Sequence, residues 1–167
     1  MNIDRSIWKF VLAAMLATTS VSIAWAHEDE EENEKEHIHP PVVENAKWKN
    51  ECGSCHVAYP PGLLPAESWN AIMDDLDMHF GNNAYVDRAD SKEIRDFLVK
   101  NADTRQYKKT DKPLLRITET DWFVSEHRKV PRQVWQNSKV QSPSNCGACH
   151  TLAEKGDYRE RNVKLPK

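Results

Sequence analysis

The chain has 167 residues, a length that allows one domain or two small ones and excludes a large multidomain enzyme. Hydrophobic residues make up 39% of the chain and charged residues 29%, and the mean hydropathy is −0.76, so a group other than aliphatic side chains is expected to help fill the core. Five glycines and nine prolines exclude collagen-like and Gly/Ser low-complexity architectures, whereas the net charge of −3 excludes no class of protein.

Residues 1–26 have the pattern of a cleaved export signal. Arg5 and Lys9 supply the positive charge, a short apolar stretch follows, and an Ala-Trp-Ala triplet that ends at Ala26 fits a small-x-small cleavage site. The apolar stretch is short for an uncleaved membrane anchor. We therefore expect cleavage after Ala26, a periplasmic mature protein, and no transmembrane segment in the mature chain.

The next segment is strongly acidic, with seven acidic residues and one lysine between positions 27 and 39. Like charges at this density repel one another and leave no apolar face to bury, so residues 27–41 are predicted to form a disordered tail. Residues 40–99 then hold ten acidic and five basic residues, whereas residues 100–167 hold eight acidic and fifteen basic ones. The division fits ordinary solvated surface, or a polarised molecule whose basic half steers toward an acidic partner.

Hydrophobic spacing predicts helices over 44–56, 67–80 and 90–101. The second of these places five apolar residues on one stripe, with Pro65 before it and Gly81 as its stop. The third begins with an Asp-x-x-Glu pattern at position 90 that resembles a capping box.

Periodicity weakens after residue 101. A short helix is predicted from about Thr120 to Lys129, where Pro131 stops it, and another around 146–154. No segment shows the alternation of a strand, so the fold class is predicted to be mainly α.

All four cysteines fall in two copies of one motif, Cys-x-x-Cys-His, at Cys52, Cys55, His56 and at Cys146, Cys149, His150. This arrangement is typical of covalent c-type haem, because two thiols one helical turn apart form thioethers to the two vinyl groups. The histidine that follows then ligates the iron from the proximal side. We therefore predict two covalently bound haems c.

Three alternatives use the same residues. A zinc site made of four cysteines needs neither histidine and favours a reducing compartment. A thioredoxin-like redox pair is expected beside a βαβ pattern, which the sequence does not show. Two structural disulfides suit an exported chain but leave the two identically placed histidines unexplained.

Each iron also needs a distal ligand. After the proximal pair and the histidines of the acidic tail are set aside, the candidates in the mature chain are His79, His127, Met73 and Met78. Two irons and two plausible histidines favour bis-histidine ligation at both sites, by His79 and His127. Each lies 23 residues from one proximal histidine and is assigned to that haem, while a crossed pairing stays open.

Ligation by two histidines fills both axial positions and forgoes the methionine ligand that raises the potential of an iron, so both potentials should be low. This favours an electron carrier with no catalytic residue. The alternative is a small diheme peroxidase or a reductase subunit with one open iron.

With these residues in view, the chain resembles the bacterial diheme cytochrome c (DHC) family. The stretch from Trp48 to Gly81 carries the resemblance, most specifically in its Tyr-Pro-Pro-x-Leu-Leu-Pro run at 59–65, and the segment from Trp122 to His127 and the second motif add to it. The resemblance implies a class I cytochrome c-like N-terminal lobe, placed at 42–104, and a less regular C-terminal lobe around the second haem, placed at 105–167.

The resemblance also implies bis-histidine haems and electron delivery to another redox protein, either a monohaem cytochrome or a membrane b-type cytochrome. We expect a monomer that binds no nucleic acid. The acidic tail has no counterpart in the resemblance.

Overall fold

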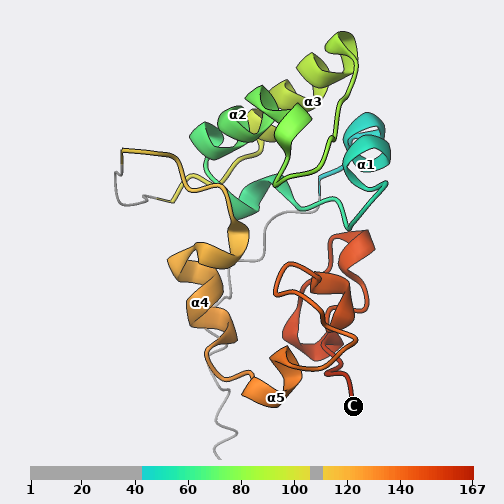
Figure 1. Cartoon of the computed structure of the whole chain (residues 1–167), viewed down its shortest axis with the longest axis vertical. Helices are drawn as coiled ribbons and strands as arrows, with labels where there is room; N and C mark the ends of the chain where they lie inside the picture. The colour runs from blue at the N-terminus through green and yellow to red at the C-terminus, as the bar shows by residue number, and fades with distance from the viewer. Residues whose placement is uncertain (1–42, 106–110) are drawn as a thin grey trace, which may run out of the picture. The chain divides into compact units, whose positions relative to one another are not determined.

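The computed structural model describes residues 43–105 and 111–167, all of which lie in one compact unit of the chain (Figure 1). The predicted export signal and the predicted acidic tail lie outside the described residues. Within these two ranges the regular structure consists of α-helices and 3-10 turns, and the only β pairing is a set of isolated bridges. The mainly α-helical prediction is confirmed. We call residues 43–105 the N-terminal region and residues 111–167 the C-terminal region.

The first helix, α1, spans Ala46–Cys52 and is shorter than the predicted 44–56. It begins at Asn45, whose side chain accepts a hydrogen bond of 2.9 Å from the backbone N–H of Trp48 and so caps the helix. The helix ends at Gly53. Its last residue is therefore the first cysteine of the first motif.

The second helix, α2, spans Ala66–Asp74, followed by the 3-10 turn η2 over Leu76–Met78. The prediction of a single helix over 67–80 is wrong at its C-terminal end. The chain leaves the helical conformation at Asp75, where three aspartates lie within four residues. Negative charge is unfavourable at a helix C-terminus, whose carbonyl groups already carry partial negative charge. His79 therefore follows a tight turn and does not lie on the helix.

The third helix, α3, spans Arg88–Lys100. Its cap is Asp87, whose carboxylate accepts hydrogen bonds from two backbone N–H groups of the first turn, and not the predicted Asp90. The carboxylates of Asp90 and Glu93 instead pair with Lys47 of α1. The two acidic residues of the predicted capping pattern thus form ion pairs that join α3 to α1.

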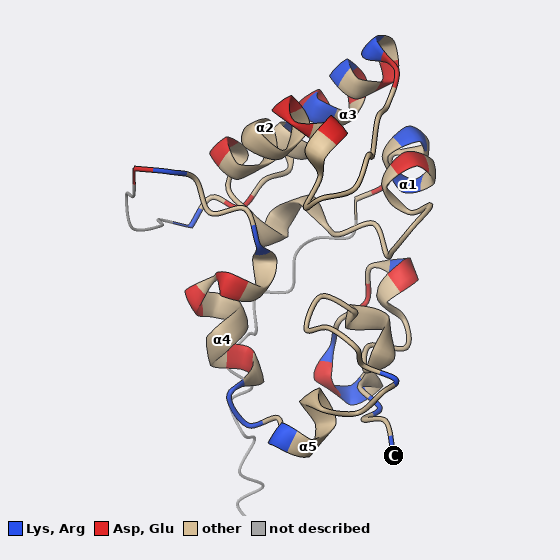
Figure 2. Cartoon of the chain, in the orientation of Figure 1, with Lys and Arg blue, Asp and Glu red and all other residues tan. Residues whose placement is uncertain are grey.

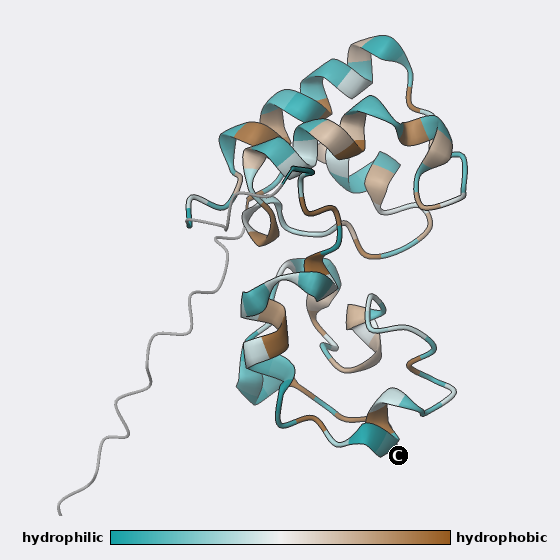
Figure 3. Cartoon of the chain, turned by 60° about the vertical axis from the view of Figure 1, so that its left-hand side comes forward, coloured by the Kyte–Doolittle hydropathy of each residue, from teal (hydrophilic) through white to brown (hydrophobic). Residues whose placement is uncertain are grey.

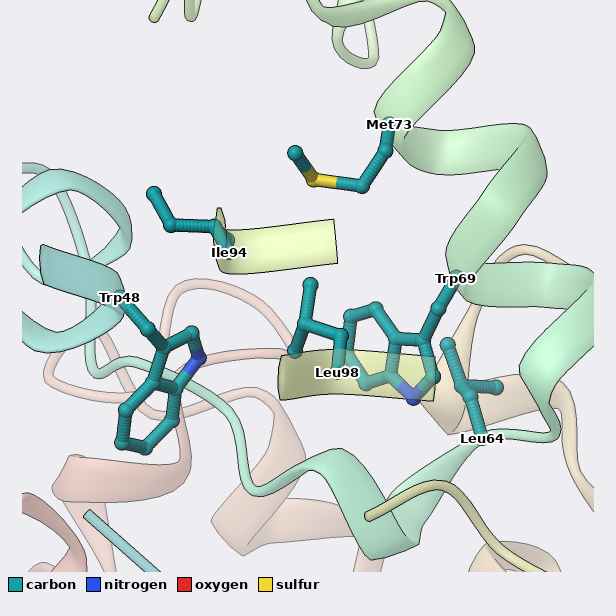
Figure 4. Packing of buried hydrophobic residues seen from close by; sticks show 6 residues of the cluster. All are labelled: Trp48, Leu64, Trp69, Met73, Ile94 and Leu98. Atoms are coloured by element: carbon teal, nitrogen blue, oxygen red, sulfur yellow. The ribbon is translucent and has the colours of Figure 1, made fainter. Parts of the chain in front are cut away.

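The core of the N-terminal region lies where α1 and α2 pack against α3 (Figure 4). Its buried residues are Trp48, Leu64, Trp69, Met73, Ile94 and Leu98. The indole N–H of Trp69 donates a hydrogen bond of 2.7 Å to the carbonyl of Pro61, so burial of this polar atom carries no penalty. The described part of this region thus has a protein core of its own.

The C-terminal region is built from shorter elements. These are η3 (Ile117–Glu119), α4 (Asp121–His127), α5 (Arg132–Trp135), η4 (Cys146–Ala148), η5 (Ala153–Lys155) and η6 (Glu160–Asn162). The predicted helix over 120–129 is found as α4, which Thr120 caps through its side-chain oxygen.

The predicted helix around residues 146–154 is wrong, because the structure has two 3-10 turns there. The carbonyls of Cys149 and Leu152 accept hydrogen bonds from the backbone N–H groups of Lys164 and Asp157. The carbonyl of Cys149, which an α-helix would pair with residue 153, is therefore taken by a partner fifteen residues away.

Few hydrophobic side chains are buried among residues 111–167, namely Phe123, Val140 and Ala153. Figure 3 shows the hydrophobic positions of this region spread over short helices and the loops between them. The C-terminal region therefore has few buried hydrophobic side chains to support its cysteine motif.

Candidate functional site

The first cysteine motif begins at the C-terminal end of α1. Gly53 closes the helix with a backbone N–H that donates to the carbonyl of Lys49 at 3.0 Å. A Cβ at this position would overlap the carbonyl oxygen of Lys49, so glycine is required for the close approach. The turn that follows carries Cys55 and His56.

The second motif starts in η4 and has a different backbone. The N–H groups of Cys149 and His150 donate to the carbonyl of Cys146 at 3.2 and 2.8 Å. The same order of Cys, Cys and His is thus presented by a helix end in one region and by a 3-10 turn in the other.

No disulfide joins any of the four cysteines in the described structure. Burial raises the pKa of the Cys52 and Cys146 thiols to about 11 and also raises the pKa of Cys149. A catalytic redox cysteine needs a lowered pKa, and a zinc ligand must be a thiolate. Within 43–105 and 111–167, moreover, no three His, Cys, Asp or Glu side chains are placed to hold a metal ion. The raised pKa values of these three thiols and the placement of the side chains therefore favour neither a redox pair nor a zinc site.

The first pair of histidines brings His79 opposite His56. Their ring centres lie 6.3 Å apart, with 21° between the ring planes. The Nδ1 atom of His56 lies 2.8 Å from the carbonyl oxygen of Val57. Because a carbonyl only accepts, this contact assigns the proton to Nδ1 and leaves the lone pair of Nε2 for a metal. Burial, and then the neighbouring His56, lower the pKa of His79, which favours its neutral form.

The second pair brings His127 opposite His150, with ring centres 6.1 Å apart and 70° between the planes. The Nδ1–H of His127 donates to the carbonyl of Phe123 at 2.9 Å, one helical turn earlier on α4. Nε2 of His127 is thereby left as the free acceptor.

Both distances fit one metal atom between each pair of rings. An imidazole nitrogen lies about 2.0 Å from a metal and about 1.1 Å from its own ring centre, so two axial imidazoles have centres about 6.2 Å apart. A porphyrin supplies the other four nitrogen ligands, so two histidines per site are sufficient. The spacing of the rings therefore fits a haem at each motif.

The other candidate ligands lie elsewhere. Met73 is buried in the core of the N-terminal region, and Met78 is 65% exposed. The histidines of the acidic tail lie outside the described residues. The ring contacts pair each distal candidate with the proximal histidine nearer in sequence.

Five aromatic residues lie against the four histidines, and one of them, Phe80, contacts His79 edge-on with ring centres 4.8 Å apart. Tyr59 stacks on His56, and Phe123 stacks on His127. Trp135 lies 5.9 Å from the His127 ring, and Tyr158 lies 5.3 Å from the His150 ring. Phe123 lies four residues before His127, a spacing that indicates their contact if the segment is helical. Loops separate Trp135 and Tyr158 from the histidines that they contact, so no local pattern indicates those two contacts.

Comparison with known proteins finds the same pattern. The sequence profile of the family "Dihaem cytochrome c" (DHC) matches residues 48–158. A diheme cytochrome c from Rhodobacter sphaeroides is 43% identical, with a TM-score of 0.64, and the match covers 70% of this chain and 98% of that one. A diheme cytochrome type c from Shewanella baltica OS155 is 42% identical, with a TM-score of 0.65 and coverage of 75% and 95%. No curated protein matches the chain.

Proposed function

Because the chain belongs to the dihaem cytochrome c family and so carries two c-type haems, we propose that it is a periplasmic electron carrier whose two irons are both ligated by two histidines. Cys52 and Cys55 attach the first haem, and Cys146 and Cys149 attach the second, each thiol forming a thioether. His56 and His150 are the proximal ligands. The distal ligands are His79 for the first haem and His127 for the second.

The observation that carries this proposal is the spacing of the two histidine pairs, 6.3 and 6.1 Å between ring centres. Either pair alone would fit an incidental contact between two imidazoles. Two pairs at the spacing of axial ligands, each containing the histidine of a haem motif, support ligation at both sites.

The haem irons supply the one-electron change between the ferric and ferrous states. The chain holds two of these histidines through hydrogen bonds at their Nδ1 atoms. His56 is fixed by the carbonyl of Val57, and His127 by the carbonyl of Phe123. A fixed imidazole keeps its orientation and basicity, as hydrogen-bonded metal ligands do in other sites.

With both axial positions filled, a substrate has no iron position to bind. This supports electron carriage, which is general in the family, over the alternative of a diheme peroxidase or reductase subunit. Ligation without methionine also supports low potentials for both irons.

The partners of a cytochrome are other redox proteins, and we propose a monohaem cytochrome or a membrane b-type cytochrome. Among the described residues, the N-terminal region has eleven acidic and seven basic side chains, and the C-terminal region has seven acidic and eleven basic ones. Figure 2 shows acidic positions along α2 and α4, positions of both signs along α3, and basic positions on α5 and the adjoining loops. An acidic partner would be attracted to the C-terminal region, and salt should slow their electron transfer.

The periplasmic location rests on the predicted export signal and cleavage after Ala26. No helix in the described ranges is long and apolar enough to cross a membrane. Cell fractionation with sequencing of the mature N-terminus checks both the compartment and the cleavage point, and a cytoplasmic protein that begins at Met1 would contradict the proposal.

The ligand assignment is tested by His79→Ala and His127→Ala, with Met73→Leu and Met78→Leu as controls. Each histidine variant should convert one of the two low-spin irons to high spin, because it removes one axial ligand and leaves the other haem intact. The methionine variants should keep both irons low-spin. Optical and EPR spectra of the purified proteins measure this, and a histidine variant with an unchanged spectrum would clear that residue of the role.

A further inference from the structure

The two histidine pairs differ in the angle between their rings. His56 and His79 are close to parallel, at 21°, whereas His127 and His150 are close to perpendicular, at 70°. The ring centres are almost equally far apart in the two pairs, so the difference lies in the rotation of the rings and not in their spacing.

At the first site, Tyr59 limits the rotation of the proximal ring. Its ring stacks on His56 with centres 4.6 Å apart and 17° between the planes. The Tyr59 hydroxyl donates a hydrogen bond of 2.6 Å to the carbonyl of Ser144, which lies two residues before Cys146. The tyrosine is therefore held at both ends, by the first histidine and by the loop that leads into the second motif.

At the second site, the corresponding contact is made on the distal ring. Phe123 stacks on His127 with centres 4.0 Å apart and 20° between the planes. Its carbonyl accepts the Nδ1–H of the same histidine. Phe123 is buried and fixed by the Thr120 cap of α4, because its own N–H donates to the Thr120 hydroxyl at 3.0 Å. Rotation of His127 would break both the stack and the hydrogen bond.

Ring orientation matters because each axial imidazole has a filled π orbital that raises one iron d orbital in energy. Parallel rings act on the same d orbital and separate it from its partner, which gives a rhombic EPR spectrum. Perpendicular rings act on the two orbitals equally and leave them nearly degenerate, which gives a single, strongly anisotropic low-field signal.

We propose that Tyr59 and Phe123 are positioning residues that hold one imidazole at each site and give the two irons different electronic structures. The first iron, between His56 and His79, has the rhombic type of spectrum. The second, between His127 and His150, has the strongly anisotropic type. This inference rests on the proposed bis-histidine ligation.

The native oxidised protein provides the first test, by low-temperature EPR. The expected spectrum contains one rhombic and one strongly anisotropic low-spin signal, with equal numbers of spins in each. Two signals of the same type would overturn the inference while leaving bis-histidine ligation intact. A high-spin signal, or an optical band of methionine ligation, would instead overturn the ligation on which the inference rests.

Substitutions at Tyr59 and Phe123 test the positioning role. Tyr59→Leu should shift and broaden the rhombic signal alone, because it removes the ring that stacks on His56. Tyr59→Phe keeps the ring and should restore the rhombic signal, although it loses the hydrogen bond to Ser144. Phe123→Leu should alter the strongly anisotropic signal alone. If Tyr59→Leu and Phe123→Leu both leave their signals unchanged, neither residue positions its histidine.

Discussion

The two cysteine motifs are carried by regions that are built in different ways. The N-terminal region packs α1 and α2 against α3 around six buried hydrophobic residues, and its motif begins at the end of α1. The C-terminal region has one two-turn helix, one single-turn helix and 3-10 turns, and its motif lies in η4. The same haem-attachment motif therefore lies beside a hydrophobic core in the N-terminal region and among short turns and loops in the C-terminal region.

This difference bears on how much apolar surface each haem must supply to stabilise the region that binds it. A short segment with few buried hydrophobic side chains cannot offset the conformational entropy of its own ordering. The N-terminal region has aromatic and aliphatic side chains for this purpose, whereas the C-terminal region needs the apolar surface of the second macrocycle. We therefore expect the C-terminal region to depend more strongly on its haem.

The largest expected effect is the loss of the second haem. In the double variant Cys146→Ser, Cys149→Ser, haem content should fall from two to one per chain, and the C-terminal region should lose its resistance to limited proteolysis. The matched variant Cys52→Ser, Cys55→Ser should also lose one haem, yet keep α2 and α3 protected. Pyridine haemochrome spectra and mass spectrometry of the fragments measure both. Equal protection of the C-terminal region with and without its haem would contradict the comparison.

A substitution in the protein core should act on the N-terminal region. Leu98 is 2% exposed, and Leu98→Ala should lower the free energy of unfolding by about 2–5 kcal/mol, because it removes buried methyl groups and leaves a cavity. Leu165→Ala, at a side chain that is 46% exposed, is the control and should have a much smaller effect. Denaturant unfolding followed by circular dichroism measures both variants. Equal losses would show that the buried cluster is not the stabilising core.

The cap of α4 should have a smaller effect. The Thr120 hydroxyl accepts the Phe123 N–H and donates to the carbonyl of Ile117 at 2.8 Å. Thr120→Ala should destabilise the protein by about 1–2 kcal/mol, and Thr120→Ser should restore most of the loss. Thermal unfolding monitored at the haem absorbance checks this, and a serine variant no better than alanine would argue against capping by the hydroxyl.

The smallest expected effect is pH-dependent. Hydrogen bonds from Arg159, and then from Asn162, hold the pKa of Asp157 below its ordinary value of 3.8. Because the folded pKa is depressed, the stabilisation is fully present above the unfolded value and is lost as the pH falls through the folded one.

Asp157→Asn should therefore be less stable than the native protein at pH 7, and this difference should shrink below about pH 4. The control is Glu154→Gln, at an exposed position of the same region. Thermal unfolding across this pH range measures the effect, and a difference that stays constant with pH would exclude a role for the Asp157 charge.

The motifs and the helix-rich class were predictable because they depend on local spacing. Cys-x-x-Cys-His is a contiguous pattern, and Trp69 and Met73 are buried on α2 as the period predicts, whereas Phe80 of the same predicted stripe lies beyond the helix and is 44% exposed. Elimination among a few candidate side chains led to His79 and His127, which the structure brings opposite His56 and His150.

What could not be predicted depends on contacts between distant residues. The segment after Cys146 is not an α-helix, and the carbonyl of Cys149 accepts a hydrogen bond from Lys164, fifteen residues away. The hydrogen bond from Tyr59 to Ser144 joins residues 85 positions apart, and no local pattern indicates it. This contact holds Tyr59 beside His56, whereas His127 is held by Phe123, four residues earlier on α4.

An electron carrier whose two irons each have two histidine ligands leaves no axial position for another ligand. Adding carbon monoxide to the reduced native protein tests this. Bis-histidine ligation predicts an unchanged optical spectrum at both haems, because His79 and His127 occupy the distal positions. Rapid formation of a carbon monoxide complex at either haem would contradict it and would favour an enzyme with an open iron.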